Sequence, residues 1–112
     1  MAITTLKLDG RLDTARVGQV ETAFAARAGA VQAGGEGAII DLSEVTYISS
    51  LGMRLLVTTL KQFSNRGIRF ATVRPREALV NDTLAIANLT ALLNMADDPA
   101  AAAAQLAALP KA

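Results

Sequence analysis

The sequence contains no cysteine and no histidine among its 112 residues. Without cysteine the chain has no disulfides, no thiolate chemistry and no cysteine-bound metal. Without histidine it lacks the usual general base and the commonest metal ligand. The two absences count against catalysis, and the lack of cysteine is consistent with the cytoplasm.

An excess of one charge and a long apolar run are also missing. The net charge is +1, from 11 basic and 10 acidic residues, so the composition does not call for nucleic acid or an anionic membrane as partner. No stretch reaches the roughly 18 to 20 apolar residues that a membrane span needs, and residues 1–9 do not have the pattern of a signal peptide. We therefore expect a soluble, cytoplasmic protein without a membrane span and without direct contact with nucleic acid.

The sequence does contain enough apolar residues for one core. Hydrophobic residues make up 52% of the chain and charged residues 19%, which is the balance of a globular domain and not of a disordered one. A chain of 112 residues is long enough for one domain and too short for two. We predict a single domain over residues 1–112.

Four segments have the pattern of β-strands. Alternation, or a short apolar run beside glycine, predicts strands at residues 3–8, 38–42, 68–73 and 92–95. Asp9-Gly10 after the first strand is a turn signal, beyond which residues 11–12 resume an extended path. Residues 43–48 are interpreted as a connection.

Four further segments are predicted to be helices. The first begins at Asp13-Thr14, which offer cap oxygens, Thr14 being the better placed, and it ends before Gly34-Gly35. The second runs over residues 51–64, with Gly67 as its left-handed end. The third covers residues 78–89 with a break near residues 81–82, and the alanine-rich fourth covers about residues 99–109. The alternation predicts an α/β fold whose mixed, mainly parallel sheet has about four to five strands, with about four helices.

One stripe of the second helix is apolar and is predicted to pack on the sheet. It consists of Met53, Leu56, Leu60 and Phe63. Leu51 and Leu55 lie off this stripe, four residues apart, and are either a half-buried edge of the core or an exposed contact patch. Arg54 belongs to the polar face of the helix and is either simply solvated or able to reach an acidic partner.

Ser50 is predicted to lie at or just before the first turn of this helix. Free backbone N–H groups and the positive end of the helix dipole meet there, so a phosphate of charge about −1.5 to −2 would be tolerated without unfolding. A partner shaped for a neutral hydroxyl would reject that phosphate. The alternative is that Ser49 and Ser50 only cap the helix. Gly52 indicates either close helix–strand packing or the close approach of a partner backbone.

The segment of residues 41–56 resembles the central motif of STAS domains. Asp41-Leu42 follows a strand, a hydrophobic and aromatic connection leads to the hydroxyl pair Ser49-Ser50, and Gly52 opens an amphipathic helix. Residues 10–13, Gly-Arg-Leu-Asp, are similar to the family's early glycine-x-leucine-aspartate. Residues 85–89 lie where the family has a helix that ends near a glycine-leucine pair. The resemblance covers roughly the whole chain and is to the anti-sigma factor antagonist type.

This resemblance implies a phosphorylation switch in bacterial transcription. In antagonists of this type the second residue of the hydroxyl pair is phosphorylated, which is Ser50 here, with Ser49 as the alternate. The unphosphorylated form binds an anti-sigma factor that is also a serine kinase, and this frees the sigma factor; a phosphatase restores the form that binds. The residues assigned to partner binding are Ser49, Ser50, Leu51, Gly52, Arg54 and Leu55. The chain departs from the family pattern at Ser49, where many members have aspartate, at Leu51, where a small residue is frequent, and at Asn88, where glycine is frequent.

Two other functions remain open from the sequence. The domain is alternatively an adaptor subunit of a larger assembly, such as a lipid-transport complex or a stress-signalling particle, without a phosphorylation switch. An enzyme with a serine nucleophile would need an activating base, and none neighbours Ser50 in the sequence. We therefore expect no enzymatic activity, no catalytic residue, no cofactor and no metal site, since the acids lack ligand spacing. Nucleotide or lipid binding and the oligomeric state are left open.

Overall fold

The computed structural model describes residues 3–31 and 37–109. Its elements follow in the order β1 (Thr4–Leu12), α1 (Thr14–Gly29), β2 (Ala38–Ile48), α2 (Ser50–Asn65), β3 (Phe70–Val73), α3 (Ala78–Ile86), α4 (Thr90–Leu93), β4 (Met95–Ala96) and α5 (Pro99–Ala108). The predicted alternation of strands and helices is confirmed.

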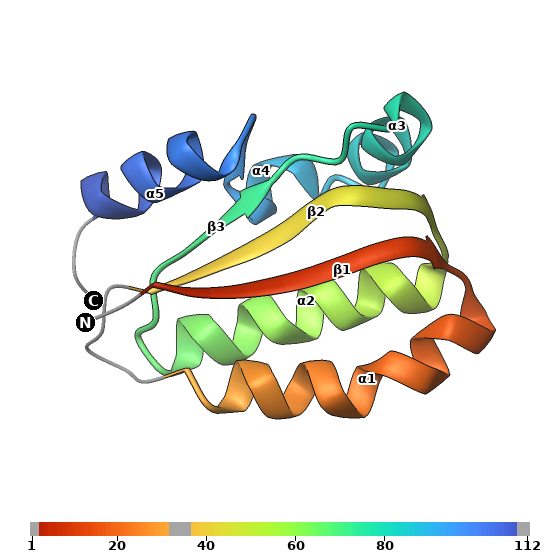
Figure 1. Cartoon of the computed structure of the whole chain (residues 1–112), viewed down its shortest axis with the longest axis horizontal. Helices are drawn as coiled ribbons and strands as arrows, with labels where there is room; N and C mark the ends of the chain where they lie inside the picture. The colour runs from red at the N-terminus through yellow and green to blue at the C-terminus, as the bar shows by residue number, and fades with distance from the viewer. Residues whose placement is uncertain (1–2, 32–36, 110–112) are drawn as a thin grey trace.

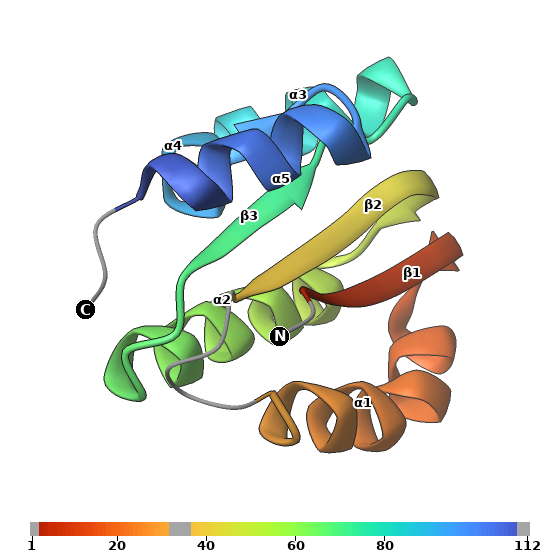
Figure 2. The same ribbon diagram turned by 60° about the vertical axis from the view of Figure 1, so that its left-hand side comes forward.

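The four strands form one sheet in the order β1-β2-β3-β4. Each pair of neighbours is parallel, so the described residues contain no antiparallel pair, although the sequence predicted a mixed sheet. Helices α1 and α2 lie side by side along one face of the sheet, and α5 lies on the opposite side against β3 and β4 (Figures 1 and 2).

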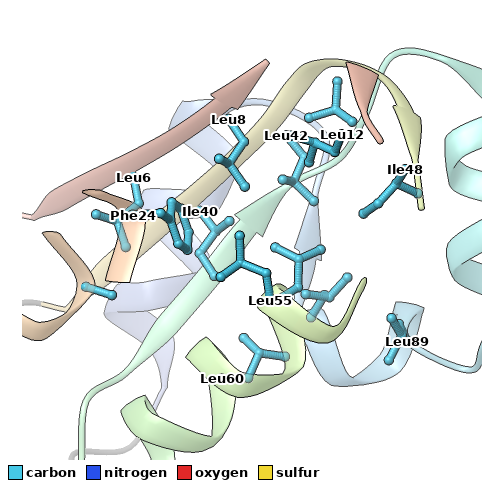
Figure 3. Packing of buried hydrophobic residues seen from close by; sticks show 14 of the residues in the cluster. Leu6, Leu8, Leu12, Phe24, Ile40, Leu42, Ile48, Leu55, Leu60 and Leu89 are labelled. Atoms are coloured by element: carbon cyan, nitrogen blue, oxygen red, sulfur yellow. The ribbon is translucent and has the colours of Figure 1, made fainter. Parts of the chain in front are cut away.

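The core consists of two clusters because β2 is buried on both faces. Successive side chains of a strand point to opposite faces, so Ile40 enters the larger cluster and Ile39 the smaller. The larger cluster joins strand residues such as Leu8 and Ile48 to Leu55 and Leu60 of α2 (Figure 3). The smaller cluster consists of Ile39, Ala71, Val73, Ala96, Ala102 and Leu106. Burial on both faces accounts for the continuous apolar run at the start of β2.

The predicted stripe of α2 does pack into the larger cluster. Leu56, Leu60 and Phe63 are buried, and Met53 is partly buried against the same cluster. Leu55 and Thr59 are buried as well. The buried face of α2 is wider than the stripe because the helix contacts α1 in addition to the sheet. Gly67, with a φ of 68°, has the left-handed conformation predicted for it just after α2.

The strand predictions were wrong around the first turn signal. Asp9-Gly10 does not end β1, which runs on to Leu12, and residues 43–48 are the second half of β2 and not a connection. The two segments pair with each other, Asp9 with Glu44 and Leu12 with Ile48. Between residues 7 and 9 and between residues 10 and 11 of β1 the register shifts, and each shift leaves one extra residue on β2, so the irregularities belong to β2. Gly10, with a φ of 67°, stays within β1 beside the second shift.

The predicted start of the first helix was wrong by one residue. Asp13 and not Thr14 is the N-cap, and its carboxylate accepts the N–H of Arg16 at 2.9 Å. The helix ends at Gly29, and Gly34-Gly35, the predicted stop, lies outside the described residues.

The predictions near the C-terminus also need correction. Helix α3 is continuous through residues 81–82, where a break was expected. Leu92 and Leu93 belong to α4 and not to a strand, so the described residues hold five helices where about four were expected. Asn94, with a left-handed φ of 52°, ends α4 and leads directly into the two residues of β4.

Candidate functional site

The serine pair lies where the two longest strands end together. Leu12 and Ile48 are the last residues of β1 and β2 and are paired with each other. The N–H of Ser49 donates to the carbonyl of Leu12 at 2.9 Å, and α2 begins at the next residue, Ser50. The start of α2 is therefore fixed directly to the sheet.

Ser49 is the N-cap of α2. Its backbone is extended, with φ −88° and ψ 172°, and its hydroxyl oxygen accepts the N–H of Gly52 at 3.2 Å. Its carbonyl accepts the N–H of Met53 at 2.9 Å. The Ser49 hydroxyl thus satisfies one of the four N–H groups that a helix start leaves without an intrahelical acceptor, and the Ser49 carbonyl accepts the first bond of the helix itself. The capping role that the sequence left open for both serines is filled by Ser49.

Ser50 is the first helical residue and is exposed. Among the hydrogen bonds of residues 3–31 and 37–109, none uses its hydroxyl. The N–H groups of Ser50 and Leu51 belong to the first turn and, unlike those of Gly52 and Met53, have no capping contact with Ser49. The Ser50 hydroxyl is therefore accessible, at a helix end whose dipole favours an anion.

Gly52 is buried between α2 and the strand ends. A Cβ atom at this position would lie 2.8 Å from Cγ1 of Ile48 and 3.3 Å from both Cβ and the carbonyl oxygen of Leu12. Of the two explanations open from the sequence, close helix–strand packing accounts for this glycine. Gly52 was also assigned to partner binding, but its burial leaves it no surface for direct contact.

Gly52→Ala is expected to destabilise the protein by about 1 to 3 kcal/mol, because the new methyl group overpacks the contact with Ile48. Helix propensity alone would make the alanine variant more stable than the glycine protein by about 1 kcal/mol. A loss of stability would therefore show that overpacking outweighs propensity. The free energy of unfolding in urea measures it. Gly18→Ala is the matched control, because a Cβ on that exposed residue of α1 meets nothing within 4 Å. Equal stability of the two variants would contradict the packing role.

Leu51 and Leu55 have different environments, although the sequence grouped them. Leu51 is 37% exposed, whereas Leu55 is 8% exposed and belongs to the larger core cluster. Arg54 is exposed and lies one helical turn after Ser50, so the two side chains share a face of α2. Within the described residues Arg54 forms no ion pair. Leu51 and Arg54 therefore lie on the surface beside Ser50, while Leu55 supports them from the core.

Two exposed residues at the ends of β1 and β2, next to the start of α2, were not predicted as site residues from the sequence. Tyr47 is 42% exposed, and the guanidinium carbon of its strand partner Arg11 lies 4.4 Å from the centre of its ring. Strand alternation predicts which way the side chain of residue 47 points. That prediction could not be made from the sequence, because residues 43–48 were interpreted as a connection and not as a strand. The exposed residues around the junction of β1, β2 and α2 are Arg11, Tyr47, Ser50, Leu51 and Arg54, and we name them the α2 N-terminal surface. Arg11 and Tyr47 leave their strands on the side opposite to Leu12 and Ile48, which face the larger core cluster.

The described residues show neither a metal site nor a membrane-spanning helix. No group of three or more histidine, cysteine, aspartate or glutamate residues within them is placed to hold a metal ion. None of their helices has both the length and the apolar character to cross a membrane. The α2 N-terminal surface combines a free hydroxyl, an aromatic ring, an exposed leucine and two guanidinium groups, which is a composition suited to protein contact.

The family model of the STAS domain matches residues 2–102. The chain belongs to the STAS domain family. The match covers nearly the whole chain, as did the resemblance found in the sequence, and the predicted α/β STAS fold is confirmed. A search of curated proteins finds none that matches this chain.

Solved structures of STAS proteins have the same fold. A crystal structure of TM1081 from Thermotoga maritima, assigned there as an anti-sigma factor antagonist, aligns with a TM-score of 0.77 and 22% identity over 95% of this chain and 92% of that one. The STAS domain of a SulP transporter from Vibrio cholerae aligns with a TM-score of 0.69 and 21% identity, over 95% of this chain and 82% of that one. An NMR structure of TM1081 aligns with a TM-score of 0.65 and 24% identity, over 92% and 80%. At these identities the likeness concerns the fold alone.

Proposed function

We propose that this STAS domain is an anti-sigma factor antagonist of the cytoplasm. In its unphosphorylated form it binds an anti-sigma factor that is also a serine kinase, and thereby frees the sigma factor. The kinase ends the interaction by phosphorylating Ser50, and a phosphatase restores it. The observation that carries the proposal is that the two serines have different environments. Ser49 caps α2, whereas the Ser50 hydroxyl is exposed and forms no hydrogen bond with any described residue.

The contact with the partner is proposed to centre on Leu51 and Tyr47. They are two of the five large hydrophobic residues that the described chain exposes. Exposed apolar and aromatic side chains beside arginine are common where a protein binds another protein. Arg54 supplies a cation for an acidic group of the partner. Ser49, Gly52 and Leu55 contribute by fixing the start of α2, and the protein is proposed to have no enzymatic activity, as is general in this family.

An adaptor function is the second candidate, and the likeness to the STAS domain of a transporter favours it. The same surface would then bind a subunit of a larger assembly without any phosphorylation. Affinity capture of the unmodified protein from extracts of its own cells, followed by identification of the bound chains, separates the two functions. A kinase-like anti-sigma factor supports the first, and transporter subunits support the second.

Leu51→Asp is expected to weaken partner binding at least tenfold, which corresponds to about 1.4 kcal/mol. The substitution puts a charge in the proposed apolar contact, while an acid in the first turn of a helix is itself well tolerated. The free energy of unfolding should change by only about 0.5 kcal/mol or less, as is usual for surface sites. Calorimetric titration with the captured partner and thermal unfolding measure the two quantities.

Leu92→Asp is the matched control for Leu51→Asp, because Leu92 is also an exposed leucine, on α4 and 58% exposed. It should bind the partner normally. A large fall in melting temperature for Leu51→Asp would show that Leu51 belongs to the core, and equal binding by both variants would remove Leu51 from the interface.

A further inference from the structure

The free edge of β1 offers backbone groups for pairing. β1 is the first strand in the order β1-β2-β3-β4, and within residues 3–31 and 37–109 no strand lies beyond it. The N–H of Thr4 donates to the carbonyl of Gly37 at 3.2 Å, so the backbone N–H and C=O groups of Thr4 point toward β2. Because backbone groups alternate along a strand, those of Thr5 and Lys7 face outward. Arg27 confirms this direction, since its guanidinium donates to the Thr5 carbonyl at 3.0 Å.

A groove of about 290 Å³ lies between this edge and α1. Its lining consists of Lys7, Leu8, Asp9, Arg16, Gln19, Val20, Ala23, Phe24 and Arg27. Leu8, Val20, Ala23 and Phe24 make its apolar part. Arg16 and Arg27 stand eleven residues apart on α1, which is about 16 Å along a helix. An extended chain covers this distance in about five residues.

The charge of the groove favours an acidic occupant. Arg16 pairs with Asp9 at 2.9 Å, and Lys7 pairs with Glu44. The Arg27 guanidinium donates to the uncharged carbonyl of Thr5, and among the described residues it forms no ion pair with a carboxylate. The lining thus holds three cations, Lys7, Arg16 and Arg27, against the one carboxylate of Asp9. A carboxylate that enters beside Arg27 gains a charge-assisted hydrogen bond.

We propose that this groove binds an extended acidic segment of another protein, which adds to the edge of β1 as a further strand. Its backbone pairs with the outward groups of Thr5 and Lys7, and Arg27 leaves the Thr5 carbonyl for an acidic side chain of the added strand. Its alternate side chains enter the groove, an apolar one over Val20 and acidic ones toward Arg16 and Arg27. Strand addition of this kind takes its affinity from the main chain and its specificity from alternate side chains.

The same charges argue against a second copy of this chain as the occupant. The groove lining has three cations and one carboxylate, so pairing two β1 edges would bring an excess of positive charge from both copies together, and like charges across an interface are unfavourable. The regular pairing of residues 4–7 with β2, followed by the shifts near Gly10, limits the usable edge to a short segment. The proposal does not depend on Ser50 and therefore stands or falls separately from the proposed function.

The test is a titration of the full chain with the capped peptide acetyl-Glu-Thr-Val-Thr-Glu-amide, followed by amide NMR. The expected result is saturable shifts in residues 4–8 and on the groove face of α1, with slower hydrogen exchange at the amides of Thr5 and Lys7. Replacing both glutamates of the peptide by lysine should weaken binding at least about tenfold. Arg27→Gln should weaken it at least about fivefold, the loss of one charge-assisted bond.

Two further variants make the test specific. Thr5→Pro removes the outward N–H and leaves the bonds of Thr4 and Leu6 to β2 in place, so it should abolish binding while the fold persists. Lys61→Gln removes an exposed charge from α2 and should bind normally. No binding at millimolar peptide, equal binding by the lysine peptide, or normal binding by both Thr5→Pro and Arg27→Gln would overturn the proposal. Shifts in residues 4–8 that depend on protein concentration without peptide would also overturn it, in favour of a second copy.

Discussion

Phe63→Ala is expected to cost about 3 to 5 kcal/mol of stability, the usual penalty for removing a fully buried aromatic ring. Phe63 is 0% exposed in the larger core cluster, and the centre of its ring lies 6.2 Å from that of Phe70. The substitution loses the apolar burial of the ring and leaves a cavity that packing around α2 cannot close completely. For a domain of this size the loss is a large fraction of the total stability. The free energy of unfolding in urea, followed by circular dichroism, measures it.

Leu79→Ala is the control for this prediction. Leu79 is a large apolar residue that is 71% exposed on α3, so its truncation should change stability by only about 0.5 kcal/mol or less. A loss below about 1 kcal/mol for Phe63→Ala would show that α2 is not packed through its C-terminal half. Because Phe63 lies at the far end of α2 from Ser50, any loss of partner binding in the variant should follow the unfolded fraction alone.

The fold was predictable where its signals are local. The helical spacing of Leu56, Leu60 and Phe63 predicts both the helix α2 and the side of it that enters the core. The second half of β2 was not predictable in this way, because residues 43–48 are a strand only through their pairing with residues 9–12. The same long-range pairing keeps Asp9-Gly10 inside β1, so that its turn signal does not end the strand. Which of Asp13 and Thr14 caps α1 depends on backbone angles that the sequence does not specify.

The site was predictable in position and not in detail. The motif places both serines at the start of α2, but only the extended backbone of Ser49 and its bond to Gly52 separate the cap from the free hydroxyl. Leu51 and Leu55 lie four residues apart on one helix, and the pattern alone does not distinguish them. Their exposures of 37% and 8% arise from the way in which the sheet and neighbouring helices cover α2.

Phosphorylation of Ser50 is expected to leave the domain folded. The phosphate would sit at the helix start, where the N–H groups of Ser50 and Leu51 have no capping contact with Ser49 and the dipole is worth about 0.3 to 1 kcal/mol to an anion. Arg54, one turn further on, adds a favourable pair of about 0.2 to 0.5 kcal/mol. The melting temperature of the phosphorylated protein should therefore equal or slightly exceed that of the unmodified one.

Partner binding, in contrast, should fall at least a hundredfold on phosphorylation. The partner would meet about two negative charges where it had contacted a hydroxyl, and burying an unpaired charge costs several kcal/mol. A hundredfold loss corresponds to about 2.7 kcal/mol. The measurement is a titration of the partner with protein that its kinase has phosphorylated, the modified residue being mapped by mass spectrometry.

Two alanine variants separate the roles of the serines in this switch. Ser50→Ala should bind the partner and resist inactivation by the kinase, because the hydroxyl that receives the phosphate is gone. Ser49→Ala should lose about 1 kcal/mol of stability with the cap and still be switched off by the kinase. If the phosphate is found on Ser49, the assignment within the pair is wrong by one residue. If neither serine is modified and Ser50→Asp binds normally, the α2 N-terminal surface is a constitutive contact and the domain is an adaptor. The partner would then tolerate a negative charge at the start of α2, whereas a phosphorylation switch requires that this charge prevents binding.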